Sequence, residues 1–404
     1  MTHRTVDDLD HDELATLVKE HLLAGHLIDR AGMPVVTAHG IDVMRDVAID
    51  EWMGASPIYT KRTQRLLGFE GDTVEACFKA MQLEIGAPPE FMDFRYTVVD
   101  DHHGLFHLDH CGALMDVEPM GEEFVVTMCH HIEDPTFDAT GWATNPRLRM
   151  RPIHRPPRAP VDRHPHCAWE VTIDESVEAT PRPPQLDRME ATRAAGLPIT
   201  PIDVADGDPD GLLDYSQPLD PDLQVRQFAT PVLRAFDEEA CLQGQLLSLS
   251  FMAAVEDRFG AEIATDALAR QFTGVAGAVA GRLRRAFDLG ARVDDVATVF
   301  SLHPAFSPAA YVDWQVAVDG DVVRLALGDC PARDEDGLTS WAGLLADGHD
   351  EALSAIAAGV DPHWVVRPDG DCRWVVEATG DPVVERGEVT LVKFSTGVAF
   401  TFDR

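Results

Sequence analysis

Cysteines with histidine and carboxylate neighbours gather in one part of this chain. Cys111 follows a histidine and precedes Gly112, and Cys129 stands directly before a pair of histidines. An adjacent imidazole lowers the pKa of a thiol and makes it a nucleophile, and a nearby carboxylate orients that imidazole. We therefore expect a Cys–His–carboxylate site with these candidate catalytic residues: Cys111, Cys129, His131 and Asp134.

The same cluster suits a metal ion as an alternative to nucleophilic chemistry. Thiolate and imidazole together favour zinc or iron. Cys129 is expected to end a strand, and because His131 is two positions further along, a strand there would place both side chains on one face. No Cys-x-x-Cys pair accompanies them, so the identity of any cofactor stays open between zinc, iron and none. The candidate ligands are Cys111, Cys129, His131, His166 and Cys167.

A run of arginines follows the cysteine cluster. Residues 145–166 carry six arginines in a chain whose net charge is −36. Arg149 and Arg151 alternate on an expected strand and would share a face, where a guanidinium can hold a carboxylate or phosphate. Either they bind an anionic small-molecule substrate or they pair with the protein's own acidic surface. The candidate substrate-binding residues are Asn145, Arg149, Arg151 and His154.

The composition narrows the classes of partner. Asp and Glu total 69 against 33 Lys and Arg. The resulting negative electrostatic field repels nucleic-acid backbones and anionic lipid. We find no apolar stretch of about 20 residues and no basic–apolar leader, so no membrane partner is expected. Seven cysteines without a leader favour a reducing, cytoplasmic location. A homodimer is the default symmetric assembly.

The elements that must position these residues occur twice. Asp100 precedes Cys111 by 11 positions, and Asp319 precedes Cys330 by the same interval. Further agreements follow in the same order, which identifies two diverged copies of one unit. The copies close with Cys-x-Trp-x-Val motifs at 167–171 and 372–376. The first copy alone is rich in histidine, so we place function there.

Local patterns assign elements to each copy. Alternation of apolar and polar residues predicts β-hairpins at 94–111, with Gly104 in its turn, and at 312–330. Apolar residues at helical spacing predict helices before each hairpin, at 73–85 in the first copy and at 261–289 in the second. Three glycines in the latter predict close packing of another element. They are Gly274, Gly277 and Gly281.

The fold class is therefore α+β, as two tandem repeats that each consist of a helical block followed by an antiparallel sheet. We expect an N-terminal repeat at 1–175, a proline-rich acidic linker at 176–222 and a degenerate C-terminal repeat at 223–404. Two more strands are expected at 389–394 and 398–402. Asp134 and Pro135 favour the start of a helix, as its N-cap and first residue.

The order of these motifs resembles the family of L-2-amino-thiazoline-4-carboxylic acid hydrolase-like proteins. The resemblance covers about residues 12–173, and a degraded version lies in the second copy without an equivalent of Cys129. It implies a hydrolase that opens a small heterocycle at a C–N or C–S bond, with cysteines and carboxylates at its site. The layout is more distantly similar to vinyl-reductase-like and haem-NO-binding α+β domains. The motif residues are Cys111, Cys129, Asp134, Asn145, Pro146 and Cys167.

Three functional hypotheses follow. The first is a hydrolase of a small carboxylated substrate at the Cys/His/Asp site of the N-terminal repeat. The second is a zinc- or iron-dependent metalloenzyme on the same cluster. The third is a non-catalytic protein that binds an apolar or haem-like molecule between its helices and sheet.

Overall fold

The first copy is a helical block that leads into a four-stranded antiparallel sheet. The structure, a computed structural model, describes residues 3–204 and 211–393. Asp10 begins the first long helix as its N-cap, because its side chain accepts a hydrogen bond from the Glu13 backbone N–H. The elements are α1 (His11–Thr37), α2 (Ile41–Leu66), α3 (Val74–Met81), β1 (Met92–Asp100), β2 (His103–Cys111), α4 (Gly112–Val117), α5 (Glu122–Val126), the π-helix η3 (Thr127–Ile132), α6 (Glu133–Thr144), β3 (Leu148–His154) and β4 (Cys167–Ile173).

The second copy repeats this order, which confirms the predicted α+β tandem architecture. Its sheet has the strand order β5-β6-β8-β7, and the first has the equivalent order β1-β2-β4-β3. The elements are α8 (Thr230–Phe259), α9 (Ala261–Ala286), α10 (Val293–Leu302), β5 (Trp314–Asp319), β6 (Val322–Leu327), α11 (Trp341–Ala346), α12 (Glu351–Val360), β7 (Trp364–Pro368) and β8 (Arg373–Ala378).

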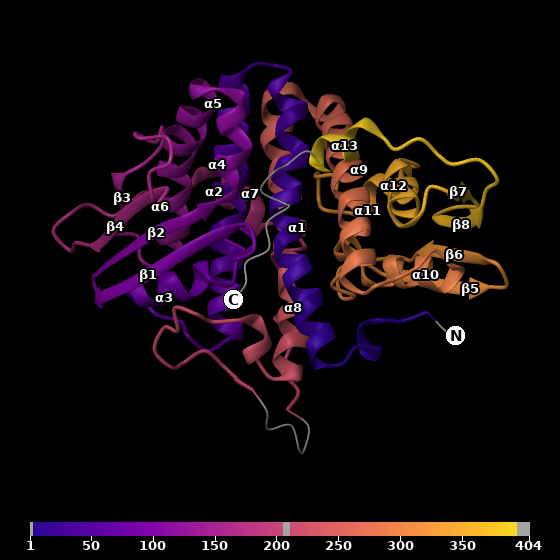
Figure 1. Cartoon of the computed structure of the whole chain (residues 1–404), viewed down its shortest axis with the longest axis horizontal. Helices are drawn as coiled ribbons and strands as arrows, with labels where there is room; N and C mark the ends of the chain where they lie inside the picture. The colour runs from indigo at the N-terminus through magenta and orange to yellow at the C-terminus, as the bar shows by residue number, and fades with distance from the viewer. Residues whose placement is uncertain (1–2, 205–210, 394–404) are drawn as a thin grey trace.

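The long helices of the two copies interlock at the centre of the molecule. Helix α1 packs more extensively on α9, and α2 on α8, than α1 packs on α2. Figure 1 shows α1 and α8 in the middle, with one sheet on either side. Gly32 lets α1 approach this closely, because a Cβ there would lie 2.8 Å from the Phe251 ring of α8. The copies therefore share one helical core.

Both predicted hairpins form, but the role of one glycine differs from the prediction. Strands β1 and β2 turn at residues 101–102, and Gly104 lies inside β2. A Cβ at Gly104 would stand 2.7 Å from side-chain atoms of Val74 and Phe78. The glycine therefore admits α3 against the sheet instead of making the turn.

The glycines of α9 have the predicted function. A Cβ at Gly277 would lie 2.7 Å from Val389, and one at Gly359 of α12 would lie 2.6 Å from the Gly277 carbonyl oxygen. Helices α9 and α12 therefore touch backbone to backbone. Such contact compensates for the low helix propensity of glycine.

Three other expectations need correction. The helix predicted at 73–85 ends at Met81, after an N-cap from the Thr73 hydroxyl. The strand expected at 389–394 is instead helix α13 (Gly387–Lys393), whose Val389 and Val392 bury themselves against α9, while 398–402 lies outside the described residues. The predicted linker includes a short helix, α7 (Pro184–Glu190), which packs on α2. Among the described helices, none combines the length and apolar character that crossing a bilayer requires.

Candidate functional site

The three predicted site cysteines of the first copy meet, together with Cys77, in one apolar core beside the N-terminal sheet. Cys111 ends β2, Cys129 lies in η3 and Cys167 begins β4, and all three are buried. Burial, with the Glu133 carboxyl nearby, raises the pKa of Cys111 to about 12 and that of the other two thiols well above their usual range. At neutral pH these groups are therefore protonated thiols, which are poor nucleophiles.

The expected strand around Cys129 is wrong. Residues 127–132 form a π-helix that runs directly into α6, so Cys129 and His131 do not share a strand face. His131 is exposed to solvent while Cys129 is buried. Asp134 does not cap a helix, since α6 continues from η3, and its carboxylate instead pairs with Arg155 at 2.5 Å.

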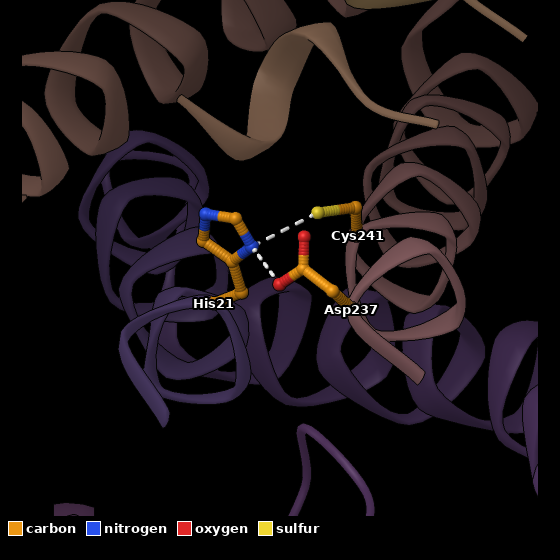
Figure 2. A group of neighbouring side chains, drawn as sticks. All are labelled: His21, Asp237 and Cys241. Atoms are coloured by element: carbon orange, nitrogen blue, oxygen red, sulfur yellow. Dashed lines mark hydrogen bonds and ion pairs between the residues drawn. The ribbon is translucent and has the colours of Figure 1, made fainter. Parts of the chain in front are cut away.

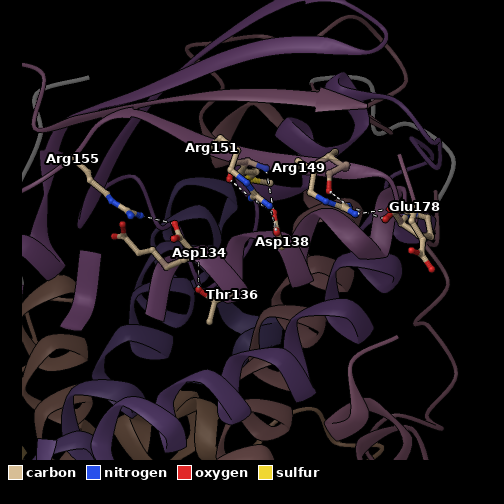
Figure 3. A network of polar contacts seen from close by, with 11 residues as sticks. Asp134, Thr136, Asp138, Arg149, Arg151, Arg155 and Glu178 are labelled. Atoms are coloured by element: carbon tan, nitrogen blue, oxygen red, sulfur yellow. Dashed lines mark hydrogen bonds and ion pairs between the residues drawn. The ribbon is translucent and has the colours of Figure 1, made fainter. Parts of the chain in front are cut away.

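The arginine run pairs with the protein's own groups. Arg151 donates two hydrogen bonds of 2.9 Å to the Asp138 carboxylate, as Figure 3 shows. Arg149 donates to backbone carbonyls, including that of Glu178 at 2.8 Å. Of the two interpretations of this run, the structure therefore favours pairing within the protein.

The remaining predicted residues also have local partners. The side-chain amide of Asn145 donates to the Asp72 carbonyl and its oxygen accepts from the Arg147 backbone N–H. His154 Nε2 lies 3.1 Å from the Pro165 carbonyl oxygen. Burial, together with the Arg158 charge, lowers the pKa of His166 to about 4.

The predicted metal ligands do not form one coordination sphere. Among the described residues, a single group brings three His, Cys, Asp or Glu ligand atoms within 4.8 Å of one another. That group is His21, Asp237 and Cys241, which lies between α1 and α8 and contains none of the predicted ligands. A buried His/Asp/Cys group that could form a site therefore exists, but at the junction of the two copies.

A pocket opens in the first copy between α1, α2, the start of the sheet and η3. A water-sized sphere can be centred in about 110 Å³ of its inner part and about 360 Å³ of its outer part. Its size suits a small molecule. The two parts are adjacent, because five residues line both, which are His26, Asp29, Met33, Ala113 and Met128.

Three carboxyls line the inner pocket and differ in acidity. Burial raises the pKa of Asp29 to about 6, although a 3.3 Å hydrogen bond from the Trp52 indole opposes the shift. Burial raises the pKa of Glu84 to about 8, and it does the same to Glu133. At pH 7 the pocket therefore offers an ionised Asp29 beside protonated glutamic acids. Such separation of acidities is how an enzyme assigns a base and an acid.

His26 contributes a neutral wall to this pocket. Burial lowers its pKa to about 3. Its Nε2 lies 3.2 Å from the Gly86 carbonyl oxygen, and its ring centroid lies 4.1 Å from that of Phe91. His26 therefore donates through Nε2 and carries no charge at neutral pH.

The position of Glu133 follows from the π-helix. A π-helix inserts extra backbone into a helical turn, is rare, and occurs often at functional sites. Helix η3 ends at Ile132, and the pocket is lined by Met128 and Ile132 of η3 and by Glu133 directly after it. No hydrogen bond from a described residue reaches the Glu133 carboxyl, which leaves it available to a ligand.

Glu51 adds a further acid behind the pocket. It is 0% exposed, and neither carboxyl oxygen has a hydrogen-bond partner among the described residues. Burial and the nearby Asp29 raise its pKa well above the usual range. Its equivalent in the second copy is Gln271, since both stand 11 positions after the N-cap glycines, Gly40 and Gly260. The neutral amide there agrees with a protonated Glu51.

The protonated glutamic acids predict how stability depends on pH. In the folded protein the pKa of Glu84 is about 8, whereas the ordinary pKa of a glutamic acid is 4.5. Unfolding therefore releases that proton at intermediate pH, and stability falls as pH rises between these two values by up to about 1.4 kcal/mol per pH unit. We expect Glu84→Gln to flatten this slope, measured by urea unfolding from pH 5 to 8. If the free energy of unfolding depends on pH in the same way for the wild type and for Glu84→Gln, Glu84 is already ionised in the folded protein over this pH range.

Sequence reasoning missed most of this pocket. It directed attention to cysteines and histidines, whereas the groups with usable acidities are carboxyls, on α1 (Asp29), at the start of α6 (Glu133) and in the segment after α3 (Glu84). A signal existed in α1, where His26, Asp29 and Met33 follow helical spacing on a face that is otherwise apolar. An acid within such a stripe indicates a buried titratable group.

Comparison with known proteins assigns no family to this chain. No family model matches it, and neither the curated proteins nor the solved structures contain a match. The resemblance to the thiazoline-carboxylate hydrolase-like family therefore depends on the short sequence motifs. The repeat architecture is supported internally, by the agreement of the two copies.

Proposed function

We propose that this protein is a hydrolase that cleaves a C–N or C–S bond of a small carboxylated molecule in the pocket of the first copy. The observation that carries the proposal is that Asp29 and Glu133 line the same pocket and differ in acidity, with pKa values of about 6 and about 8. The site residues differ from the cysteines and arginines that the sequence singled out, but they belong to the same copy.

The two carboxyls divide the proton transfers of hydrolysis. Asp29 takes a proton from a water molecule while the oxygen of that water bonds to the substrate carbon. Glu133 gives its proton to the nitrogen or sulfur that leaves as the old bond breaks. Solvent then returns a proton to Glu133 and removes one from Asp29, so that one water is consumed per turnover.

Arg30 is suited to hold the substrate carboxylate. It lines the outer pocket, and its buried Nε has no hydrogen-bond partner among the described residues. It forms a long ion pair with Asp116, whose Oδ2 lies 3.9 Å from Nε. A guanidinium with an unused N–H can bind a carboxylate without first breaking a hydrogen bond at that nitrogen.

The pH profile of activity tests this assignment. Hydrolysis of a panel of small C–N and C–S compounds, thiazoline carboxylates included, is followed by mass spectrometry. For any compound turned over, kcat/KM should rise through about pH 6 as Asp29 ionises and fall through about pH 8 as Glu133 ionises. Arg30→Met should shift the lower limb to higher pH, because the Arg30 charge lowers the pKa of Asp29. A profile that is flat from pH 5 to 9 would contradict the roles of both carboxyls.

Four methionines on the inner wall favour a second candidate, a non-catalytic carrier of an apolar molecule. Met33, Met81, Met92 and Met128 all line the pocket. Methionine adapts its shape to different apolar ligands. A panel compound that raises the melting temperature but is recovered unchanged would identify the protein as such a carrier.

A further inference from the structure

The junction of the two copies holds a polar group inside an apolar core. His21 comes from α1, and Asp237 and Cys241 come from α8, four positions apart on one helical face (Figure 2). Each of the three is 2% exposed. His21 Nδ1 lies 2.8 Å from an Asp237 carboxylate oxygen and 3.2 Å from Cys241 Sγ. One ring nitrogen therefore faces both a carboxylate and a sulfur.

The other nitrogen of His21 is already fixed. Its Nε2 lies 2.9 Å from the Leu302 carbonyl oxygen, a group that can only accept a hydrogen bond. Nε2 therefore carries a proton, and the lone pair of a neutral ring is on Nδ1, directed at Asp237 and Cys241. A backbone carbonyl in this position is the usual support of a metal-binding histidine.

The internal symmetry shows that packing does not require these residues. His26 Nε2 bonds to the Gly86 carbonyl, and Gln245 Nε2 bonds to the Ala305 carbonyl, so a shift of 219 positions relates α1 to α8. The same shift places three apolar residues at the positions that correspond to this group in the other copy. The pairs are His21 with Ala240, Val18 with Asp237 and Leu22 with Cys241.

We propose that His21, Asp237 and Cys241 bind one zinc ion that joins the two copies. The donors are an imidazole nitrogen, a carboxylate oxygen and a thiolate, each of which is a zinc ligand in proteins, and the second carboxylate oxygen of Asp237 is the candidate for a fourth position. The separations are a few tenths of an ångström shorter than zinc bonds of about 2.0–2.3 Å would give, so small side-chain rotations admit the ion. Because solvent does not reach the group, the site is structural and separate from the pocket proposed for hydrolysis.

The exchange of protons for zinc balances in charge. If the metal-free group shares one proton between His21 and Asp237 and Cys241 keeps its thiol proton, its charges sum to zero. Zinc with a neutral His21 and a Cys241 thiolate also sums to zero, and two protons leave. The buried junction therefore carries no net charge in either state, which a low-dielectric interior requires.

Cobalt substitution tests the site in the full-length protein. The chain is unfolded with chelator and reductant, freed of the chelator, and refolded without oxygen in increasing concentrations of Co²⁺. We expect one ion per chain, a thiolate-to-cobalt charge-transfer band in the near ultraviolet, and a higher melting temperature with Zn²⁺ than with chelator. Cys241→Ser should remove the band. Cys77→Ser, which alters another fully buried cysteine, should retain it.

A second measurement covers the case in which Cys241→Ser does not fold. X-ray absorption on zinc-loaded wild-type protein should show one sulfur at about 2.3 Å among nitrogen and oxygen ligands. Folded wild-type protein that takes up no metal, or a charge-transfer band that survives Cys241→Ser, would overturn the zinc site. Neither result depends on catalysis, so the hydrolase proposal stands or falls separately.

Discussion

Replacement of Glu133 by glutamine is expected to lower kcat by about 10²–10⁴-fold on any substrate that the wild-type protein hydrolyses. Glutamine preserves the size of the side chain and most of its contacts but has no proton to give to the leaving atom. KM should therefore change little. The descending limb of the pH profile near pH 8 should also disappear from the residual activity, because Glu133 is the group that titrates there. Steady-state kinetics from pH 5 to 9 measure both effects.

The adjacent residue supplies a matched comparison. Asp134 is the carboxylate that the sequence motif favours, but it pairs with Arg155 and does not line the pocket. Asp134→Asn should leave kcat close to that of the wild type. If instead Asp134→Asn abolishes turnover and Glu133→Gln does not, the site belongs to the sequence motif and the carboxyl pair proposed above is wrong.

Replacement of Arg62 by methionine is expected to destabilise the protein by about 3–5 kcal/mol. Arg62 of α2 donates hydrogen bonds of 2.7 and 2.6 Å to the Glu239 carboxylate of α8. It also donates to the Leu197 carbonyl at 2.6 Å. Both charged side chains are buried, so methionine would leave the Glu239 charge without compensation in the shared core. Urea unfolding at pH 7 measures the loss.

Two variants show whether the isolated charge causes that loss. In Arg62→Met/Glu239→Leu neither charge remains, and much of the stability should return. Arg65→Met removes an ion pair on the same helix, but Arg65 and Glu70 are 57% and 52% exposed. The cost there should be below about 1 kcal/mol. Equal losses from Arg62→Met and Arg65→Met would refute the importance of burial.

The duplication can be recognised in the sequence because equivalent residues keep the same spacing in the two diverged copies. The 11-residue step from Asp100 to Cys111 recurs from Asp319 to Cys330, and both steps form hairpins with equivalent strand order. Residue spacing does not predict that the long helices of the two copies pack on one another. Apolar stripes on α1 and α8 show that these helices are buried, but each stripe fits its own copy or the other equally well.

The sequence places the candidate site in the copy that contains the proposed pocket, but the reason for that placement only partly applies. Cys111, Cys129 and Cys167 do meet in one core, but that core protonates their thiols. The two-residue step from Cys129 to His131 fits a strand face, and only the packing around η3 converts it into a π-helix. Acidity depends on which side chains surround a group, which intervals along the chain do not encode.

The interlocked helices have a consequence for synthesis. The apolar faces of α1 and α2 are completed by α8 and α9, which begin at Thr230 and Ala261. At roughly 5–20 residues per second, the ribosome exposes these faces for on the order of ten seconds or more before their partners emerge. During that time the nascent N-terminal half is incompletely folded and its exposed apolar surface is prone to aggregate. A chain of domains that each fold on their own avoids this stage.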